Sequence, residues 1–128
     1  MSEDTAGEVG SIVWQDLTVA DAERVRDFYE AVAGWRAEPL EGDFNMFPAG
    51  SARPAAGICF AKGANAKLPP AWLVYIRVAS VEASVAQALQ RGGSIIDGPR
   101  SVGAGHLCVL RDPAGAAFAL YDSGPTHG

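Results

Sequence analysis

An indole and a carboxylate stand two residues apart in the first strand-like segment, Ile12 to Val19. Side chains two apart on a β-strand point to the same face, so Trp14 and Asp16 are expected to share one. An indole can stack on a planar group while a carboxylate orients a cationic or hydroxyl group, and together they suit a small organic ligand. A buried carboxylate needs a partner, so an internal ion pair is the alternative reading of Asp16.

The second strand-like segment, residues 72–78, carries a comparable set of side chains. Leu73, Tyr75 and Arg77 alternate along it and are expected to share a face. Arg77 is the expected charged neighbour of Asp16, near the mouth of a ligand cavity. Trp14 and Tyr75 can equally be plain core residues, as buried aromatic side chains usually are.

His106 is the histidine best placed for proton transfer, with an exposed residue at a loop end as the alternative. It follows Gly103-Ala104-Gly105, which places it near the edge of a sheet or the mouth of a cavity. The pattern of residues 106–111 leaves open whether the face with His106 or the opposite face lines that cavity. Cys59 and Cys108 are expected to be reduced and buried, and their spacing fits neither a redox motif nor a zinc motif.

Composition excludes several other functions. Fifteen acidic and ten basic residues give a formal net charge of −5, and no basic run exists, which argues against nucleic acid as a partner. The sequence contains no phosphate-binding loop and no nucleophile elbow. No apolar stretch is long enough to span a bilayer, and the start of the chain lacks the basic and apolar character of a secretory signal. We expect a cytoplasmic protein without a membrane partner.

The elements that must position these residues occur twice. Each strand-like segment is followed by a helix that begins after a capping side chain and ends at glycine. A constant offset of 59 residues relates Val19 to Val78, Asp21 to Ser80, and Gly34 to Gly93. The expected apolar faces of the two helices are Ala22, Val25, Phe28 and Val32 in the first, and Val81, Val85, Ala88 and Leu89 in the second.

The repeat predicts an α+β fold of two βαβββ modules that form one curved mixed sheet around a central cavity. Further short strands are expected near residues 35–39, 44–47 and 57–60, and near 94–97, 106–111 and 117–120. The chain is then one domain, residues 1–128. It divides into a flexible tail (1–10), a first module (11–61), a linker (62–71), a second module (72–122) and a second flexible tail (123–128).

The sequence resembles a known superfamily, the glyoxalase/bleomycin-resistance or vicinal oxygen chelate proteins. The residues that carry the resemblance are the run from Val19 to Trp35, the segment from Gly92 to Pro99, and the turn from Asp112 to Phe118. The resemblance extends over nearly the whole chain, from Ser11 to Tyr121. The resemblance implies a glyoxalase-like domain and, since many relatives pair modules between chains, a homodimer.

The resemblance also implies where a divalent metal would be held, by a ligand on the first strand and on the last strand of each module. The first-strand positions fall on Trp14 and Leu73, and the last-strand position of the second module falls on Ala119. Its counterpart in the first module is expected near Cys59. Gln15 reaches the cavity only if the strand slips by one residue. We therefore expect no metal site and no cofactor.

Three functions compete on this basis. The favoured one is a metal-independent small-molecule-binding protein that holds its ligand in the cavity between the modules. The second is an enzyme: a metal-dependent lyase or dioxygenase of the same superfamily with a displaced metal, or an enzyme that transfers protons through His106 and Asp16. The third is a protein-interaction module with a filled core. The expected ligand-binding residues are Trp14, Asp16, Leu73, Tyr75, Arg77 and His106.

Overall fold

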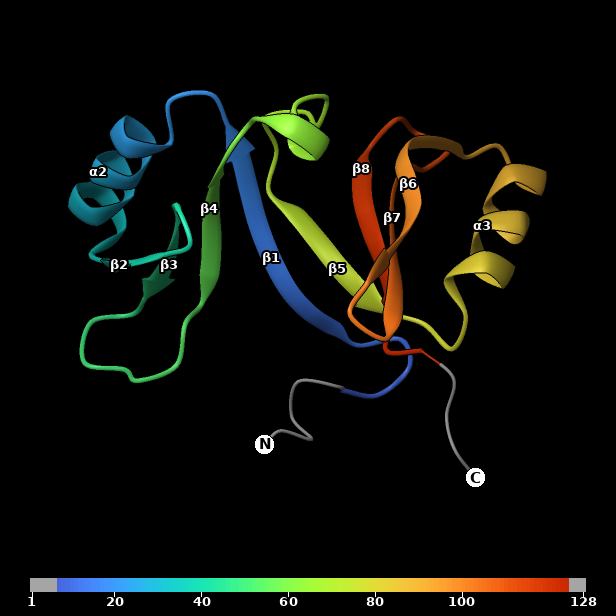
Figure 1. Cartoon of the computed structure of the whole chain (residues 1–128), viewed down its shortest axis with the longest axis horizontal. Helices are drawn as coiled ribbons and strands as arrows, with labels where there is room; N and C mark the ends of the chain where they lie inside the picture. Colours follow the sequence, from blue (N-terminus) through green and yellow to red (C-terminus); the bar gives the residue numbers. More distant parts are fainter. Residues whose placement is uncertain (1–6, 125–128) are drawn as a thin grey trace. The chain divides into compact units, whose positions relative to one another are not determined.

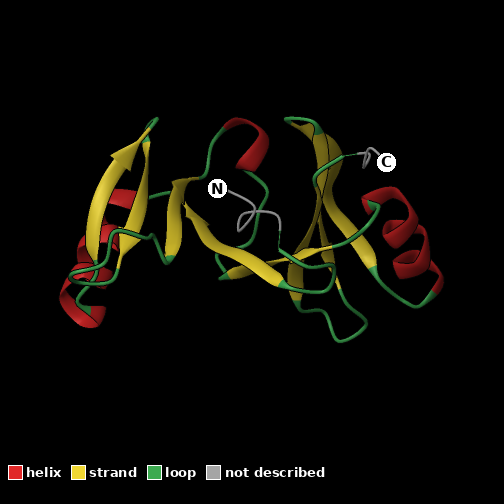
Figure 2. Ribbon diagram, turned by 90° about the horizontal axis from the view of Figure 1, so that it is seen from below, coloured by secondary structure: helices red, strands yellow, loops and turns green. Residues whose placement is uncertain are grey.

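The computed structural model describes residues 7–124, apart from the side chain of residue 64. The described chain divides into two compact units, residues 14–72 and residues 73–124 joined by residues 7–13. Each unit contains one α-helix and four strands of the sheet, and the α-helix lies against one face of the strands of its own unit (Figures 1 and 2). The α+β class and the two βαβββ modules are thereby confirmed.

In the first module the strands are ordered β2-β3-β4-β1. β1 runs parallel to β4, and the other neighbouring strands are antiparallel, so the sheet is mixed. The elements are β1 (Ile12–Val19), α2 (Ala22–Ala33), β2 (Arg36–Leu40), β3 (Asp43–Phe47) and β4 (Ala56–Phe60), followed by a short 3-10 helix, η1 (Gly63–Asn65).

The ends of α2 form as the sequence predicts. The carboxylate of Asp21 accepts a hydrogen bond from the backbone N–H of Arg24 at 3.3 Å, and Gly34 ends the helix at a φ of 73°, a conformation that glycine adopts without strain. The predicted apolar face was partly wrong, because Phe28 and Val32 are 55% and 65% exposed.

The helix instead packs through Ala22, Val25 and Tyr29 against a core of Phe44, Met46 and Ile58. At 3.6 residues per turn these three helix positions span about one sixth of a turn in total, whereas Phe28 points about a quarter of a turn away from their mean direction. Tyr29 also stacks on Trp35, with ring centroids 5.7 Å apart, and accepts a hydrogen bond from Nε1 of Trp72 at 3.0 Å.

In the second module the strands are ordered β5-β8-β7-β6, with β5 parallel to β8 and the remaining pairs antiparallel. This arrangement repeats that of the first module. The elements are β5 (Leu73–Arg77), α3 (Val81–Gln90), β6 (Ser94–Val102), β7 (Gly105–Arg111) and β8 (Ala117–Asp122).

The helix of the second module settles which face of β7 is covered. The hydroxyl of Ser80 caps α3 by accepting from the N–H of Ala83 at 3.1 Å. Val81 and Val85 of α3 pack in one core cluster with Cys108, Leu110 and Leu120. His106 lies two residues before Cys108, so it belongs to the helix-covered side of the sheet. Leu89, expected in the apolar face of α3, is 51% exposed.

The ends of the chain are only partly described. Residues 1–6 and 125–128, which fall within the tails expected to be flexible, lie outside the described residues. Residues 7–10 run beside β5, where Gly10 N–H donates to the carbonyl of Arg77 at 2.7 Å. No helix between residues 7 and 124 is long and apolar enough to cross a membrane. That the two modules enclose a central cavity stays a prediction.

Candidate functional site

A small pocket of about 180 Å³ lies within the first module, beside Trp14 and Asp16. The residues between and after them in β1 face the other way: Leu17 is buried opposite Ile58, which packs with Ala22 of α2. The predicted shared face of Trp14 and Asp16 is therefore present in the structure. The pocket is lined by Trp14, Asp16, Leu40, Glu41, Asp43, Phe44, Asn45, Gly57 and Cys59.

Gly57 lines the pocket next to the side chains of Trp14 and Asp16. It is the partner of Asp16 in the parallel pairing of β1 with β4. A Cβ at position 57 would lie 3.3 Å from Cβ of Asp16 and 3.5 Å from Cζ2 of Trp14. Gln15 does not line this pocket, and its side-chain amide donates to the carbonyl of Ala55. The strand has not slipped by one residue.

The carboxylates in this pocket raise the pKa of the neighbouring Cys59 thiol. Burial raises the pKa of the Cys59 thiol, and the nearby carboxylates of Asp16 and Asp43 raise it further, to about 12, against a smaller opposing effect of a hydrogen bond with Thr18. Asp43 is fixed by a hydrogen bond from the N–H of Phe60 to its Oδ1 at 3.0 Å. At neutral pH Cys59 is a protonated thiol, which is a poor nucleophile and a poor metal ligand.

The strand register corrects one of the expected metal-ligand positions. In the second module Ala119 pairs with Tyr75, and in the first module Gly57 pairs with Asp16. Tyr75 follows Asp16 by the repeat offset of 59, so the counterpart of Ala119 is Gly57 and not Cys59. The expected position, Cys59, is two residues beyond Gly57. The sequence does not reveal this difference, because the loop between β3 and β4 changes the spacing within the first module.

None of the four positions carries a metal-binding side chain. They are Trp14, Gly57, Leu73 and Ala119, and the last two are completely buried. Within residues 7–124, no group of three or more His, Cys, Asp or Glu side chains is placed to hold a metal ion.

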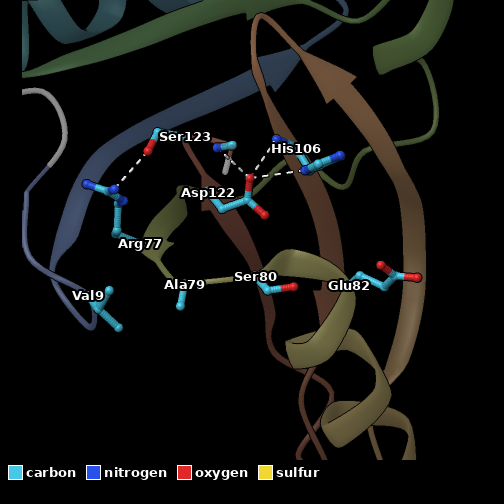
Figure 3. A pocket seen from close by; sticks show the side chains of 9 residues that line it. Val9, Arg77, Ala79, Ser80, Glu82, His106, Asp122 and Ser123 are labelled. Carbon is cyan, nitrogen blue, oxygen red and sulfur yellow. Dashed lines mark hydrogen bonds and ion pairs between the residues drawn. The ribbon is translucent and has the colours of Figure 1, made fainter. Parts of the chain in front are cut away.

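A larger pocket, of about 520 Å³, lies within the second module (Figure 3). It contains two of the residues expected from the sequence, Arg77 and His106. The remaining lining comes from the start of α3, the end of β8 and the segment before β1. The complete lining is Val9, Arg77, Ala79, Ser80, Glu82, His106, Asp122, Ser123 and Gly124.

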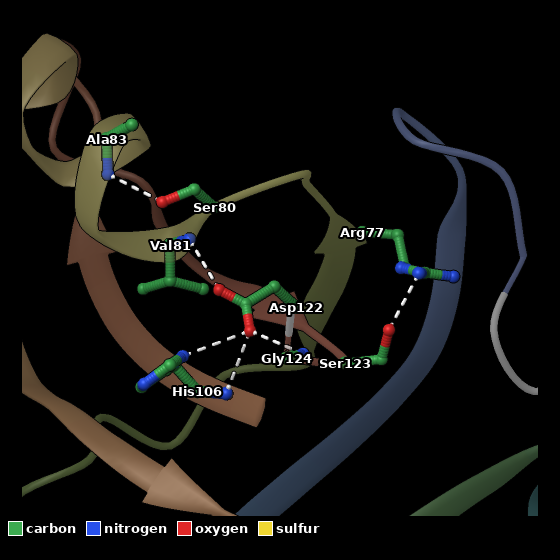
Figure 4. Close-up of polar contacts among 8 residues, drawn as sticks. All are labelled: Arg77, Ser80, Val81, Ala83, His106, Asp122, Ser123 and Gly124. Atoms are coloured by element: carbon green, nitrogen blue, oxygen red, sulfur yellow. Dashed lines mark hydrogen bonds and ion pairs between the residues drawn. The ribbon is translucent and has the colours of Figure 1, made fainter. Parts of the chain in front are cut away.

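The centre of this pocket is Asp122, a buried carboxylate that the sequence analysis missed. Its Oδ2 accepts from the N–H of Val81, the first residue of α3, at 2.7 Å. Its Oδ1 accepts from the N–H of His106 at 3.1 Å and from the N–H of Gly124 at 3.0 Å. The same oxygen lies 3.1 Å from Nδ1 of the His106 ring (Figure 4).

These contacts fix both the charge of Asp122 and the tautomer of His106. Burial raises the pKa of Asp122, but the hydrogen bonds from Val81, His106 and Gly124, with the charge of His106, outweigh it and hold this pKa below its usual value. An ionised carboxylate only accepts hydrogen bonds, so Nδ1 of His106 must be the donor. In the neutral ring, Nε2 is then the acceptor.

Arg77 is held at the edge of the same pocket. One Nη donates to the carbonyl of Gly7 at 2.9 Å, and the other donates to the hydroxyl of Ser123 at 2.8 Å. Ser123 directly follows Asp122, so neighbouring residues at the end of β8 contact Arg77 and His106. The two side chains lie on opposite sides of Asp122 (Figures 3 and 4).

The structure thus brings the six expected ligand-binding residues together only in part. Trp14 and Asp16 share the pocket of the first module, and Arg77 and His106 share the pocket of the second. Leu73 and Tyr75 line neither. Tyr75 pairs with Ala119 on the face of the second-module sheet opposite Cys108, whereas His106 is on the side of Cys108.

A family model described as a glyoxalase-like domain matches residues 12–121. "Putative glyoxylase CFP32" of Mycobacterium tuberculosis (strain CDC 1551 / Oshkosh) is 30% identical over 123 residues, which cover 92% of this chain and 46% of that protein. "Anthracycline biosynthesis protein DnrV" of Streptomyces peucetius is 30% identical over 135 residues, covering 93% of this chain and 49% of that protein. The chain spans about half the length of these curated relatives.

Two solved structures share the fold. A selenomethionine form of methylmalonyl-CoA epimerase superposes with a TM-score of 0.53 at 16% identity, covering 94% of this chain and 99% of that one. A variant of Streptomyces coelicolor methylmalonyl-CoA epimerase, in complex with 2-nitronate-propionyl-CoA, gives 0.50 at 19% identity, covering 92% and 100%. At these identities the likeness concerns the fold alone.

Proposed function

Because the chain belongs to the glyoxalase-like domain family, we propose that it binds a small organic molecule and does so without a metal ion. The observation that carries the proposal is the content of the four positions where the superfamily resemblance implies metal ligands. Trp14, Gly57, Leu73 and Ala119 offer no donor atom that binds a divalent cation. The neighbouring thiol of Cys59, with its pKa raised to about 12, does not replace them.

The pocket beside Trp14 supports a ligand with a planar part and a cationic or hydroxyl group. The indole supplies a flat wall for stacking, and Gly57 leaves the space next to it open. Asp16 and Asp43 supply carboxylates that attract a cation or accept from a hydroxyl group. A pocket of about 180 Å³ accommodates one part of a ligand, such as a ring or an amine, rather than a large molecule.

One relative supports an aromatic ligand. DnrV is described as an anthracycline biosynthesis protein, and the planar ring system of an anthracycline is suited to stacking on the indole of Trp14. The metal-dependent lyase or dioxygenase remains the competing function, and it requires a metal bound by residues outside the four positions.

The direct test is a titration of intrinsic tryptophan fluorescence with aromatic amines, including an anthracycline, in the presence of EDTA. We expect saturable quenching that Trp14→Phe and Asp16→Asn each weaken by about tenfold, the loss of one stacking or charge-assisted contact. Trp35→Phe is the matched control, because Trp35 lies in the aromatic cluster of the same module and does not line the pocket. Binding that needs an added metal ion, or that neither substitution at the pocket changes, would contradict the proposal.

We also propose that the chain forms a homodimer. The support is the pairing of modules between chains that the superfamily resemblance implies, and a set of exposed apolar side chains that association would cover. These include Ile12, Phe28, Val32, Leu40 and Ile95. Light scattering at high micromolar concentration should give twice the chain mass of 13.3 kDa, and a value equal to the chain mass would contradict it.

A further inference from the structure

The hairpin turn between β2 and β3 forms part of the wall of the Trp14 pocket. Leu40 of β2 pairs with Asp43 of β3, so Glu41 and Gly42 form a two-residue loop between the strands. Leu40, Glu41 and Asp43 all line the pocket. The turn therefore places one apolar and two acidic side chains at the pocket that contains the indole.

Glu41 occupies a backbone conformation that its residue type disfavours. Its φ is 52°, and within residues 7–124 no other residue except glycine has a positive φ. Gly42, which follows it, has a φ of 91°. A two-residue hairpin loop with positive φ at both positions favours Asn followed by Gly, because asparagine tolerates the left-handed region better than a longer side chain does. The turn itself therefore gives no reason for a glutamate at this position.

The carboxylate of Glu41 is not used by the fold. In the part of the chain that the structure describes, it accepts no hydrogen bond and forms no ion pair. Asp43, at the other end of the turn, uses only Oδ1, which accepts from the N–H of Phe60. The ammonium group of Lys62 is close to the turn, but it lies over the ring of Phe60, 5.6 Å from its centroid, and neither of these two residues lines the pocket.

The side chains that line the pocket carry charge of one sign. Asp16, Glu41 and Asp43 are acidic, and no Lys, Arg or His is among the lining residues. The raised pKa of the Cys59 thiol reflects this negative potential, since the carboxylates of Asp16 and Asp43 contribute to it. Such a potential attracts an ammonium group, acts little on a neutral hydroxyl group and repels a carboxylate.

We propose that Glu41 selects a cationic ligand for the Trp14 pocket, so that the ligand is an aromatic ammonium compound and not an aromatic alcohol or acid. This selection rests on the function proposed above, since it acts on a ligand that stacks on Trp14. Glu41 and Asp43 supply carboxylate oxygens to the ammonium group. Leu40, which is 52% exposed, offers apolar contact from the same turn.

Three ligands with the same ring and similar length separate charge from stacking: 2-phenylethylamine, 2-phenylethanol and phenylacetate. At about pH 7 the amine is a cation and phenylacetate an anion. Each is titrated against the tryptophan fluorescence of the full chain, with EDTA present. We expect the amine to bind about fivefold more tightly than the alcohol, which corresponds to one exposed charged contact, and phenylacetate to bind more weakly than the alcohol. Added salt should weaken the binding of the amine and leave that of the alcohol unchanged.

Variants assign this preference to one side chain. Glu41→Gln keeps the length of the side chain without its charge, and it should remove most of the preference for the amine while the alcohol binds as before. Glu23→Gln is the matched control, because Glu23 is exposed in the first turn of α2 and does not line the pocket. Trp14→Phe should instead weaken the binding of the amine and the alcohol alike.

Glu41→Asn separates the contact with the ligand from the fold. Asparagine suits the left-handed position, so the unfolding midpoint of this variant should stay the same or rise, while its preference for the amine falls as in Glu41→Gln. A glutamate that served only the fold would give the opposite result: a lower unfolding midpoint in both variants and an unchanged preference for the amine.

Two further results would overturn the selection by Glu41 without touching the proposed function. One is equal affinity of the amine and the alcohol for the unmodified chain, with Trp14→Phe still weakening both. The other is a preference for the amine that persists in full in Glu41→Gln, which would assign it to other carboxylates. If none of the three ligands binds saturably below about 10 mM, the proposed function and the selection by Glu41 both fail.

Discussion

Gly57 lies directly against the indole of Trp14: a Cβ at position 57 would lie 3.5 Å from Cζ2 of the ring. In the superfamily that the chain resembles, both of these strand positions are expected to supply metal ligands. Here one is an aromatic wall and the other has no side chain. The two residues complement each other, since the missing side chain is what leaves the indole accessible from the pocket.

A side chain at position 57 should occupy part of the pocket beside the indole of Trp14 and exclude a ligand from it. In Gly57→Ala the added methyl group would meet Cβ of Asp16 at 3.3 Å, which is closer than ordinary contact. We expect a loss of unfolding free energy of about 1 kcal/mol from overpacking, and a weakening of aromatic-amine binding by tenfold or more. Chemical denaturation and the fluorescence titration measure the two effects. An alanine variant that binds as tightly as the unmodified chain would mean that the ligand is bound elsewhere.

The carboxylate of Asp122 should stabilise the second module in a pH-dependent manner. In Asp122→Asn the amide cannot accept all four N–H contacts, and we expect a loss of about 3 kcal/mol in unfolding free energy at pH 7. Asp112→Asn is the matched control, because Asp112 is only partly buried, lies in a turn, and uses one oxygen, Oδ1, for the N–H groups of Ala114 and Ala116. Equal losses for the two variants would show that Asp122 has no special role.

The pH profile follows from the direction of the Asp122 pKa. This pKa is lower in the folded chain than in the unfolded chain, so the unfolded chain takes up a proton first on acidification. The contribution of Asp122 is therefore complete above the unfolded value of about 4 and is lost as pH falls through the folded value. Denaturation midpoints should be measured over about three pH units, from roughly pH 6 to pH 3, which include the unfolded pKa of an aspartate. They should fall less steeply for Asp122→Asn than for the unmodified chain, because the variant lacks the carboxylate whose protonation destabilises the folded state.

The thiol of Cys59 should be unreactive in the folded chain. With its pKa raised to about 12, almost none is thiolate at pH 8, and Cys108 is buried with a raised pKa as well. Iodoacetamide should label Cys59 at least about tenfold more slowly in the folded chain than in guanidinium chloride. Mass spectrometry of the labelled peptides separates the two cysteines. Labelling of Cys59 at the rate of a free thiol would contradict the electrostatic description of the pocket.

The hydrogen bond between Trp72 and Tyr29 should contribute to the stability of the first module. Tyr29→Phe removes the acceptor of the 3.0 Å contact and leaves the indole N–H of Trp72 without it, for an expected loss of about 1 kcal/mol. Tyr121→Phe is the control, because the Tyr121 hydroxyl has no hydrogen bond within residues 7–124. Denaturation curves that place both variants at the same midpoint would rule out this contribution.

The sequence was sufficient for features that depend on local chemistry. The capping side chains of Asp21 and Ser80, the left-handed Gly34 and the alternation of Trp14 with Gln15 all follow from neighbouring residues. The repeat supplied the module order, because matched positions 59 residues apart restrict the chain to two copies of one unit.

The rest depends on pairing between distant segments, which no local pattern specifies. Two of the three residues that bind Asp122, Val81 and His106, are 41 and 16 residues away, so its role appears only once β7, β8 and α3 are assembled. A carboxylate at the end of an otherwise apolar strand was the available signal. The assignment of Cys59 instead of Gly57 failed for the same reason, because the loop before β4 conceals the register. Phe28 was misplaced because helical spacing alone does not identify the direction of the core.

The most direct test of the central claim, ligand binding without a metal ion, is the melting temperature of the purified and EDTA-treated chain with micromolar Mn²⁺, Ni²⁺ or Zn²⁺. A metal that binds the folded state raises this temperature by mass action. We predict no change with any of the three ions, since Trp14, Gly57, Leu73 and Ala119 occupy the four expected ligand positions. A saturable rise in melting temperature that EDTA reverses would contradict the account and favour the metal-dependent enzyme.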